Sequence, residues 1–114
     1  MTDRYEVDFE PHGRAGWMIY RAESELKFPW EVGGDKGLIV EIPSQDEWKD
    51  FCIKSNAEWA LNERDKIITR LAKDEARKPF WWGGEYEIEE KWIYIFPGRS
   101  WLTQLLDRLF HSHA

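Results

Sequence analysis

The sequence predicts one α+β domain spanning residues 1–114, with a mainly antiparallel sheet of about five or six strands and three helices packed on one face. Strand-like alternation fills the first third of the chain, and short turns separate its segments. Apolar residues at helical spacing follow in the middle and recur at the end. Strands followed by helices favour an α+β architecture, and 114 residues suit a single domain.

The first four strands are predicted from alternation and from turn residues. Residues 4–10 alternate apolar with charged side chains, which is the period of a half-buried strand. Further strands are expected over 16–21, 26–30 and 38–42, and Pro29 places the third at an edge or at a bulge. The short connections between these strands predict antiparallel pairing.

A helical region begins after the fourth strand. Ser44 and Glu47 have the spacing of a capping box, in which each side chain accepts a hydrogen bond from the other's backbone amide. The helical spacing that starts at Trp48 is expected to break near Ser55–Asn56, and a longer helix is expected over 57–77. The inner stripe of the longer helix comprises Trp59, Ala60, Ile67, Ile68, Leu71 and Ala72.

Alternation returns near the C-terminus. Residues 85–96 are expected to form one long strand, or two strands with a tight turn at Glu90–Lys91. A third helix is predicted over 100–111, where the amphipathic pattern is the strongest in the chain. Its apolar stripe comprises Trp101, Leu102, Leu105, Leu106, Leu109 and Phe110.

Composition and charge narrow the class of partner. The formal net charge is −6, which disfavours nucleic acid and anionic lipid as partners and suits a basic partner. The N-terminal residues lack a secretory pattern and no stretch has the length of a membrane span, so we expect no membrane partner. The single cysteine excludes an intramolecular disulfide and fits a cytoplasmic location.

The negative charge concentrates in the strand-rich segments. Residues 1–43 contain nine acidic and five basic side chains, whereas residues 44–78 are balanced. Alternation places Glu6, Asp8 and Glu10 on one side of the first strand. It likewise groups Glu85, Glu87 and Glu89. If helices cover one face of the sheet, the other face becomes an acidic surface for a cationic partner, or simply the solvated side of the strands.

Trp81 and Trp82 are the most suggestive pair among the eight tryptophans. They precede Gly83–Gly84 in a predicted loop, and neighbouring side chains in an extended segment point in opposite directions. One indole can then anchor in the core while the other is exposed to a partner. The alternative is that both cover the edge of the core.

The residues capable of chemistry have ordinary explanations. Cys52 lies on the inner stripe of a predicted helix and is interpreted as a small buried hydrophobe. His12 is interpreted as a turn residue, and His111 with His113 supplies fewer ligands than zinc usually needs. No nucleophile, metal or phosphate-loop motif is present, so we expect no catalytic residue, no metal and no cofactor.

The leading functional hypothesis is a small acidic, non-catalytic binding module that docks a protein partner, with a basic partner favoured. Its expected contact residues are Trp81, Trp82, Glu85, Glu87 and Glu89. One alternative is an enzyme or small-molecule binder with an aromatic pocket between sheet and helices. The other is a structural subunit that forms a homodimer or larger oligomer through its C-terminal helix.

Overall fold

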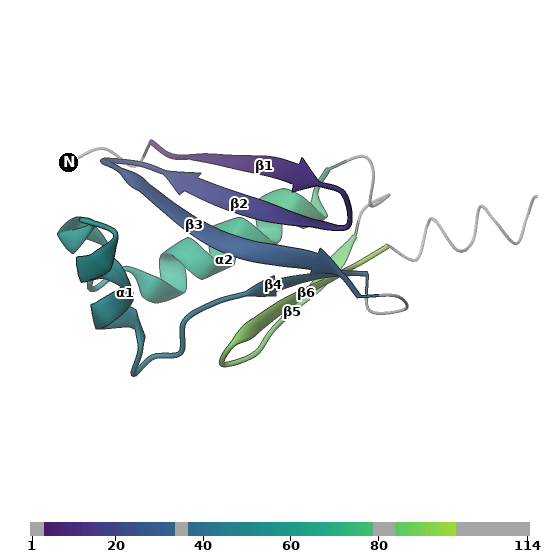
Figure 1. Cartoon of the computed structure of the whole chain (residues 1–114). Helices are drawn as coiled ribbons and strands as arrows, with labels where there is room; N and C mark the ends of the chain where they lie inside the picture. The colour runs from purple at the N-terminus through teal and green to yellow at the C-terminus, as the bar shows by residue number, and fades with distance from the viewer. Residues whose placement is uncertain (1–3, 34–36, 79–83, 98–114) are drawn as a thin grey trace, which may run out of the picture.

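A computed structural model describes residues 4–33, 37–78 and 84–97, which form one antiparallel sheet with helices against it (Figure 1). The six strands lie in the order β1-β2-β3-β4-β6-β5. The strands are β1 (Glu6–His12), β2 (Ala15–Arg21), β3 (Glu25–Val32), β4 (Leu38–Glu41), β5 (Glu85–Ile88) and β6 (Trp92–Phe96). The helices are α1 (Trp48–Lys54), the 3-10 helix η2 (Glu58–Ala60) and α2 (Arg64–Ala76).

The predicted antiparallel sheet is confirmed. Each successive pair of strands from β1 to β4 is antiparallel, and β1 continues two residues beyond the prediction, to His12. Gly13 then turns the chain with a φ of 73°, a conformation that glycine adopts without strain. Residues 85–96 form two strands rather than one, since β5 and β6 pair across a turn that contains Glu90–Lys91.

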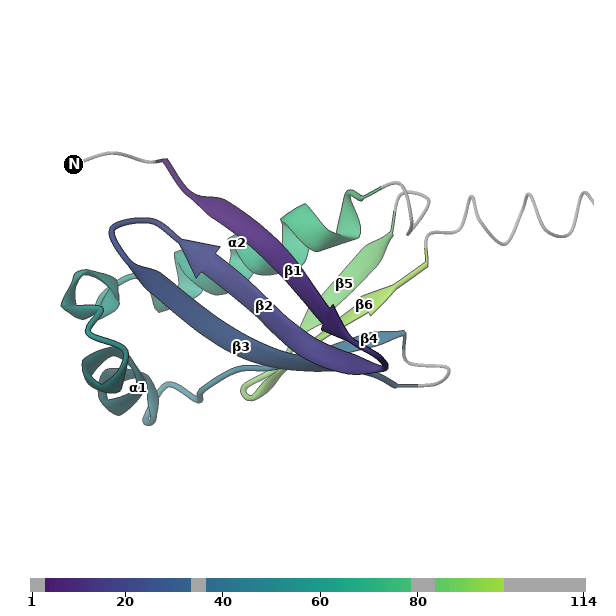
Figure 2. The ribbon, with the colours of Figure 1, turned by 45° about the horizontal axis from the view of Figure 1, so that its top comes forward.

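The helical insertion follows β4, and the chain then returns so that β6 pairs with β4. The helix α2 lies across a single face of the sheet, and α1 lies at one end of it (Figure 2). We call the face under α2 the helix face and the opposite face the open face. The buried core cluster includes Phe28, Val40, Ile67, Leu71 and Ile93, so it lies between the helix face and α2.

The prediction of one helix over 57–77 is wrong. The break near Ser55–Asn56 is present, because α1 ends at Lys54 and Asn56 has a positive φ of 54°. The next turn is the 3-10 helix η2, and α2 begins only at Arg64. The Ala60 carbonyl accepts hydrogen bonds from the Trp48 indole at 2.9 Å and from the Glu63 amide at 3.0 Å. In a continuous helix it would accept from Arg64 instead.

The predicted capping box is confirmed. The Ser44 amide donates to Glu47 Oε1 at 3.0 Å, and the Glu47 amide donates to Ser44 Oγ at 3.3 Å. The box closes the turn that leads into α1, whose first residue is Trp48. Trp48 is buried against Phe28 of β3, with ring centroids 6.4 Å apart, and this contact fixes α1 at the end of the sheet.

The prediction of three helices on one face needs correction. The described residues contain two α-helices and one short 3-10 helix, and only α2 lies along the sheet face. The third predicted helix, over 100–111, lies outside the described residues. The inner stripe of α2 agrees with the prediction, since Ile67, Ile68, Leu71 and Ala72 are all buried.

Candidate functional site

The open face carries an unbroken row of side chains across all six strands. Antiparallel register aligns His12, Ala15, Glu31, Ile39, Tyr94 and Glu87 in that order. Directly paired residues lie side by side on one face of a sheet. The middle of the row is apolar at Ile39 and aromatic at Tyr94, and a carboxylate follows on each side at Glu31 and Glu87.

A second row, which is interrupted between β3 and β4, repeats this composition with two tryptophans. Trp17 of β2 lies between Glu10 and Pro29, and Trp92 of β6 pairs with Glu41. Trp17 is 39% exposed although it stands in the middle of a strand. An indole that the core does not bury presents a large flat surface to solvent, which is typical of contact residues in binding interfaces.

The charge on the open face is strongly negative. Its carboxylates are Glu6, Asp8, Glu10, Glu25, Glu31, Glu41, Glu85, Glu87 and Glu89. Its strand cations are Arg21 and Lys27. Arg21 forms ion pairs with both Asp8 and Glu25, and the Arg21 hydrogen bond lowers the pKa of Glu25. Within the described part of the chain, the side chains of Glu31, Glu41 and Glu87 form no ion pair.

The two acidic stretches predicted from alternation both lie on the open face. Glu6, Asp8 and Glu10 occupy the outer strand β1. Glu85 and Glu87 occupy the other outer strand β5, and Glu89 follows it with its amide bonded to the Trp92 carbonyl. The stretches therefore face the same side but stand at opposite edges of the sheet. The aromatic side chains between them were not predicted as site residues, because their role depends on which strands become neighbours.

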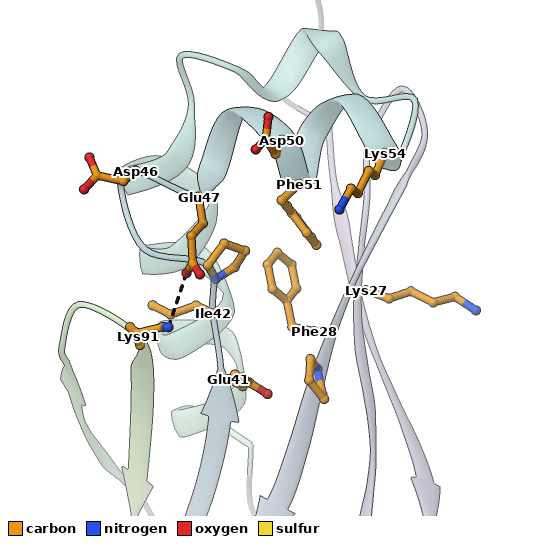
Figure 3. A pocket seen from close by; sticks show the side chains of 12 residues that line it. Lys27, Phe28, Glu41, Ile42, Asp46, Glu47, Asp50, Phe51, Lys54 and Lys91 are labelled. Carbon is orange, nitrogen blue, oxygen red and sulfur yellow. Dashed lines mark ion pairs between the residues drawn. The ribbon is translucent and has the colours of Figure 1, made fainter.

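A pocket of about 460 Å³ opens beside the second row, where β3 and β4 separate (Figure 3). Only Trp30–Val32 of β3 pair with β4. The residues of β3 that precede Trp30 have no partner on β4, so the two strands diverge there. Phe28 from β3 and Phe51 from α1 approach each other inside the pocket, with ring centroids 5.3 Å apart. Pro29 and Glu41 belong both to the pocket lining and to the open face. The pocket and the open face therefore form one continuous surface, which we call the acidic–aromatic surface.

Hydrogen bonds hold the rim of this pocket in place. The backbone amide of Ser44 is the main cause of a lowered pKa at Glu47, and Lys91 Nζ lies 3.5 Å from the same carboxylate. The Arg64 guanidinium donates to the Pro43 carbonyl at 2.9 Å and to the Glu90 carbonyl at 2.8 Å. These contacts join α2, the turn before α1 and the β5–β6 hairpin, so the pocket is set by tertiary structure.

Cys52 lies away from this surface, His12 lies at one end of its first row, and the remaining candidate residues lie outside the described residues. Cys52 is fully buried, and burial raises the pKa of its thiol, as expected of a packing residue. His12 Nε2 lies 3.0 Å from Glu10 at an exposed position. Among the described residues no group of three or more His, Cys, Asp or Glu side chains is arranged for a metal ion. Trp81, Trp82, His111 and His113 lie outside that part of the chain.

Comparison of this chain with protein-family models, curated proteins and solved structures finds no match. None of the helices in residues 4–33, 37–78 and 84–97 is long and apolar enough to cross a membrane.

Proposed function

We propose that this protein is a binding module whose acidic–aromatic surface docks a protein partner that presents arginine side chains. The observation that carries the proposal is the alternation of aromatic and carboxylate side chains on the open face. Trp17, Trp92 and Tyr94 each have a carboxylate as a direct cross-strand neighbour.

This alternation suits a guanidinium group better than an ammonium group. A guanidinium stacks on an aromatic face and donates two parallel hydrogen bonds to a carboxylate, so one arginine can use both kinds of neighbour. A lysine ammonium is a more strongly hydrated point charge and gains less from the indole. The arrangement at Glu10 and Trp17 therefore favours arginine over lysine.

The unpaired carboxylates supply long-range attraction. A positively charged partner associates with a negative surface faster than with a neutral surface. Charge complementarity also disfavours acidic competitors. Glu31 pairs with Ile39 and Glu41 pairs with Trp92 within the sheet, and Glu87 pairs with Tyr94 from the edge strand β5. Their alignment supports a cationic partner over a purely apolar one.

The experiment is an amide chemical-shift titration of the full chain with a nine-residue arginine peptide and, separately, a nine-residue lysine peptide. We expect salt-sensitive shifts confined to the strands around Trp17, Ile39 and Tyr94, with the arginine peptide binding more tightly. The Trp17→Ala/Trp92→Ala variant should lose most of this binding. Lys49→Ala, at an exposed position of α1, is the matched control and should retain it.

Two results would overturn the proposal. One is a set of shifts centred on α2 rather than on the open face. The other is equal binding by the Trp17→Ala/Trp92→Ala variant and the wild-type chain, with both proteins folded by circular dichroism.

A further inference from the structure

An apolar cleft of about 600 Å³ lies on the helix face, where α2 ends. Phe9 and Trp30 form part of its lining, and their rings stack with centroids 4.4 Å apart. Val32 and Leu38 line the cleft from β3 and β4, and Lys78 lines it just beyond α2. The cleft is on the opposite side of the sheet from the acidic–aromatic surface, so the two are separate sites.

Two features of the cleft indicate that it takes an occupant. Trp30 is only 4% exposed, yet its indole N–H has no hydrogen-bond partner among the residues that the structure describes. Buried donors are nearly always paired, so an acceptor is missing at this position. Val32 is 44% exposed although it lies in the row of Leu38 and Ile95, which are buried. Among residues 4–33, 37–78 and 84–97, α2 covers the middle of the helix face, and none of them covers Val32 at this end.

The described part of the chain ends beside the cleft. Pro97 forms part of the lining and is the last described residue, and residues 98–114 follow it. Three residues separate Pro97 from Trp101, so the apolar stripe of 100–111 starts within roughly 14 Å of the lining. A helix over 100–111 would be about 18 Å long and present its leucines and aromatic residues on one side.

We propose that the segment 98–114 of the same chain docks in this cleft, with the apolar stripe of 100–111 packed on Phe9, Trp30 and Val32. Attachment at Pro97 keeps the stripe at a high effective concentration beside the cleft, which favours this occupant over a second copy or a free ligand. The backbone carbonyls of the residues after Pro97 bring acceptors for the Trp30 indole. Docking would place on the helix face the third helix that the sequence predicts, over 100–111.

The test is paramagnetic broadening in the full chain. A nitroxide is attached at Thr103→Cys, on the polar side of the predicted helix, in a Cys52→Ala background. We expect strong broadening of the amide signals of Gly13, Val32 and Leu38. The amide signals of α1, which lies at the opposite end of the sheet from the end of β6 (Figure 1), should be unaffected.

Matched variants separate docking from general effects of added charge. Leu105→Asp/Leu106→Asp places two carboxylates on the stripe and should abolish the broadening. Gln104→Asp/His111→Asp adds the same two carboxylates on the polar side and should preserve it. Val32→Asp alters the cleft instead of the segment and should also reduce the broadening.

The outcomes decide between occupants. An isotopic mixture, in which only unlabelled chains carry the nitroxide, shows whether broadening passes between molecules. Broadening in the mixture, together with its loss on dilution of samples in which every chain carries the nitroxide, would assign the cleft to a second copy and overturn the proposal. Absence of broadening in the folded full chain would overturn it as well. The amide signals of the cleft residues can also be followed as a hydrophobic dye is added to the chain with its native stripe. A response would show that the cleft is open and would overturn the proposal.

Discussion

The helix face and the open face are built from alternate residues of the same six strands, yet they follow different rules. On the helix face, Met18, Phe28 and Ile93 are fully buried and pack against the core. On the open face, Trp17 of the same strand as Met18 is 39% exposed. Side chains that point toward α2 must be apolar because they pack in the core. Side chains on the other face contact solvent, so the fold requires of them only that the protein stay soluble.

The difference in exposure between the two faces separates the aromatic residues that are explained by packing from those that are not. Phe28 stacks near both Trp48 and Phe51, so its size is set by the end of the core that α1 closes. Trp17 and Trp92 have carboxylates as neighbours instead and are not members of the core cluster. Burial therefore accounts for the aromatic residues of the helix face, whereas it does not account for Trp17 on the open face, for which we propose a role in binding.

The largest expected effect tests the helix face. Phe28→Ala removes a fully buried ring between β3 and α1 and should lower the free energy of unfolding by about 3–5 kcal/mol. Equilibrium urea unfolding measures this change. Trp17→Ala is the control from the open face, and its effect should stay below about 1 kcal/mol. Equal losses for the two variants would remove the distinction between the faces.

The next effect tests the open face. Trp17→Ala should weaken binding of the arginine peptide by about 1 kcal/mol, the size of a partly desolvated cation–π contact, or roughly fivefold in Kd. Isothermal titration calorimetry measures the affinity. Tyr86→Ala, at an exposed aromatic residue of the helix face, is the control and should leave the affinity unchanged.

A smaller effect is expected from a single charge. Glu31→Gln keeps the shape of the side chain and removes one carboxylate from the middle of the first row. We expect a loss of about 0.5 kcal/mol in binding of the same peptide, as for an exposed ion pair, and a weaker dependence on salt. Affinities measured at low and high salt provide the comparison. An unchanged salt dependence would argue against electrostatic attraction at Glu31.

The smallest effect concerns the pocket rim and pH. The Ser44 amide holds the pKa of Glu47 in the folded protein below its ordinary value of 4.5. The contribution of Glu47 to stability is therefore present above that value and is lost as pH falls through the lower folded pKa. Melting temperatures across this range should fall less steeply with acid for Glu47→Gln than for the wild-type chain. Parallel curves would contradict the assigned role of the capping box.

The residues of the helix face could be predicted from the sequence more completely than those of the candidate site, because burial leaves a local pattern in the sequence. The alternation of Tyr5, Val7 and Phe9 and the stripe Ile67–Ile68–Leu71 record burial directly, because each is a local pattern. The acidic character of the open face was also readable from alternation within β1 and β5. The aromatic residues between these strands were not, since only strand order places Tyr94 beside Ile39 and Trp17 between Glu10 and Pro29.

The helical break shows a similar limit. Local spacing predicted helix from 57 to 77, and the capping and side-chain preferences of Ser55 and Asn56 located the first break. The second break, before Arg64, accompanies a hydrogen bond from Trp48 to the Ala60 carbonyl across twelve residues of chain. A contact of that kind has no signature in a local window.

The sequence by itself determined the α+β class, the antiparallel strands, the capped helical insertion and the acidity of the strand-rich segments. These follow from periodicity, turn chemistry and charge, which act over a few residues at a time. The tertiary structure decided that β6 returns beside β4, and this placed Tyr94 next to Ile39. It also opened the pocket where β3 and β4 diverge, because strand pairing and helix packing join residues that the chain keeps far apart.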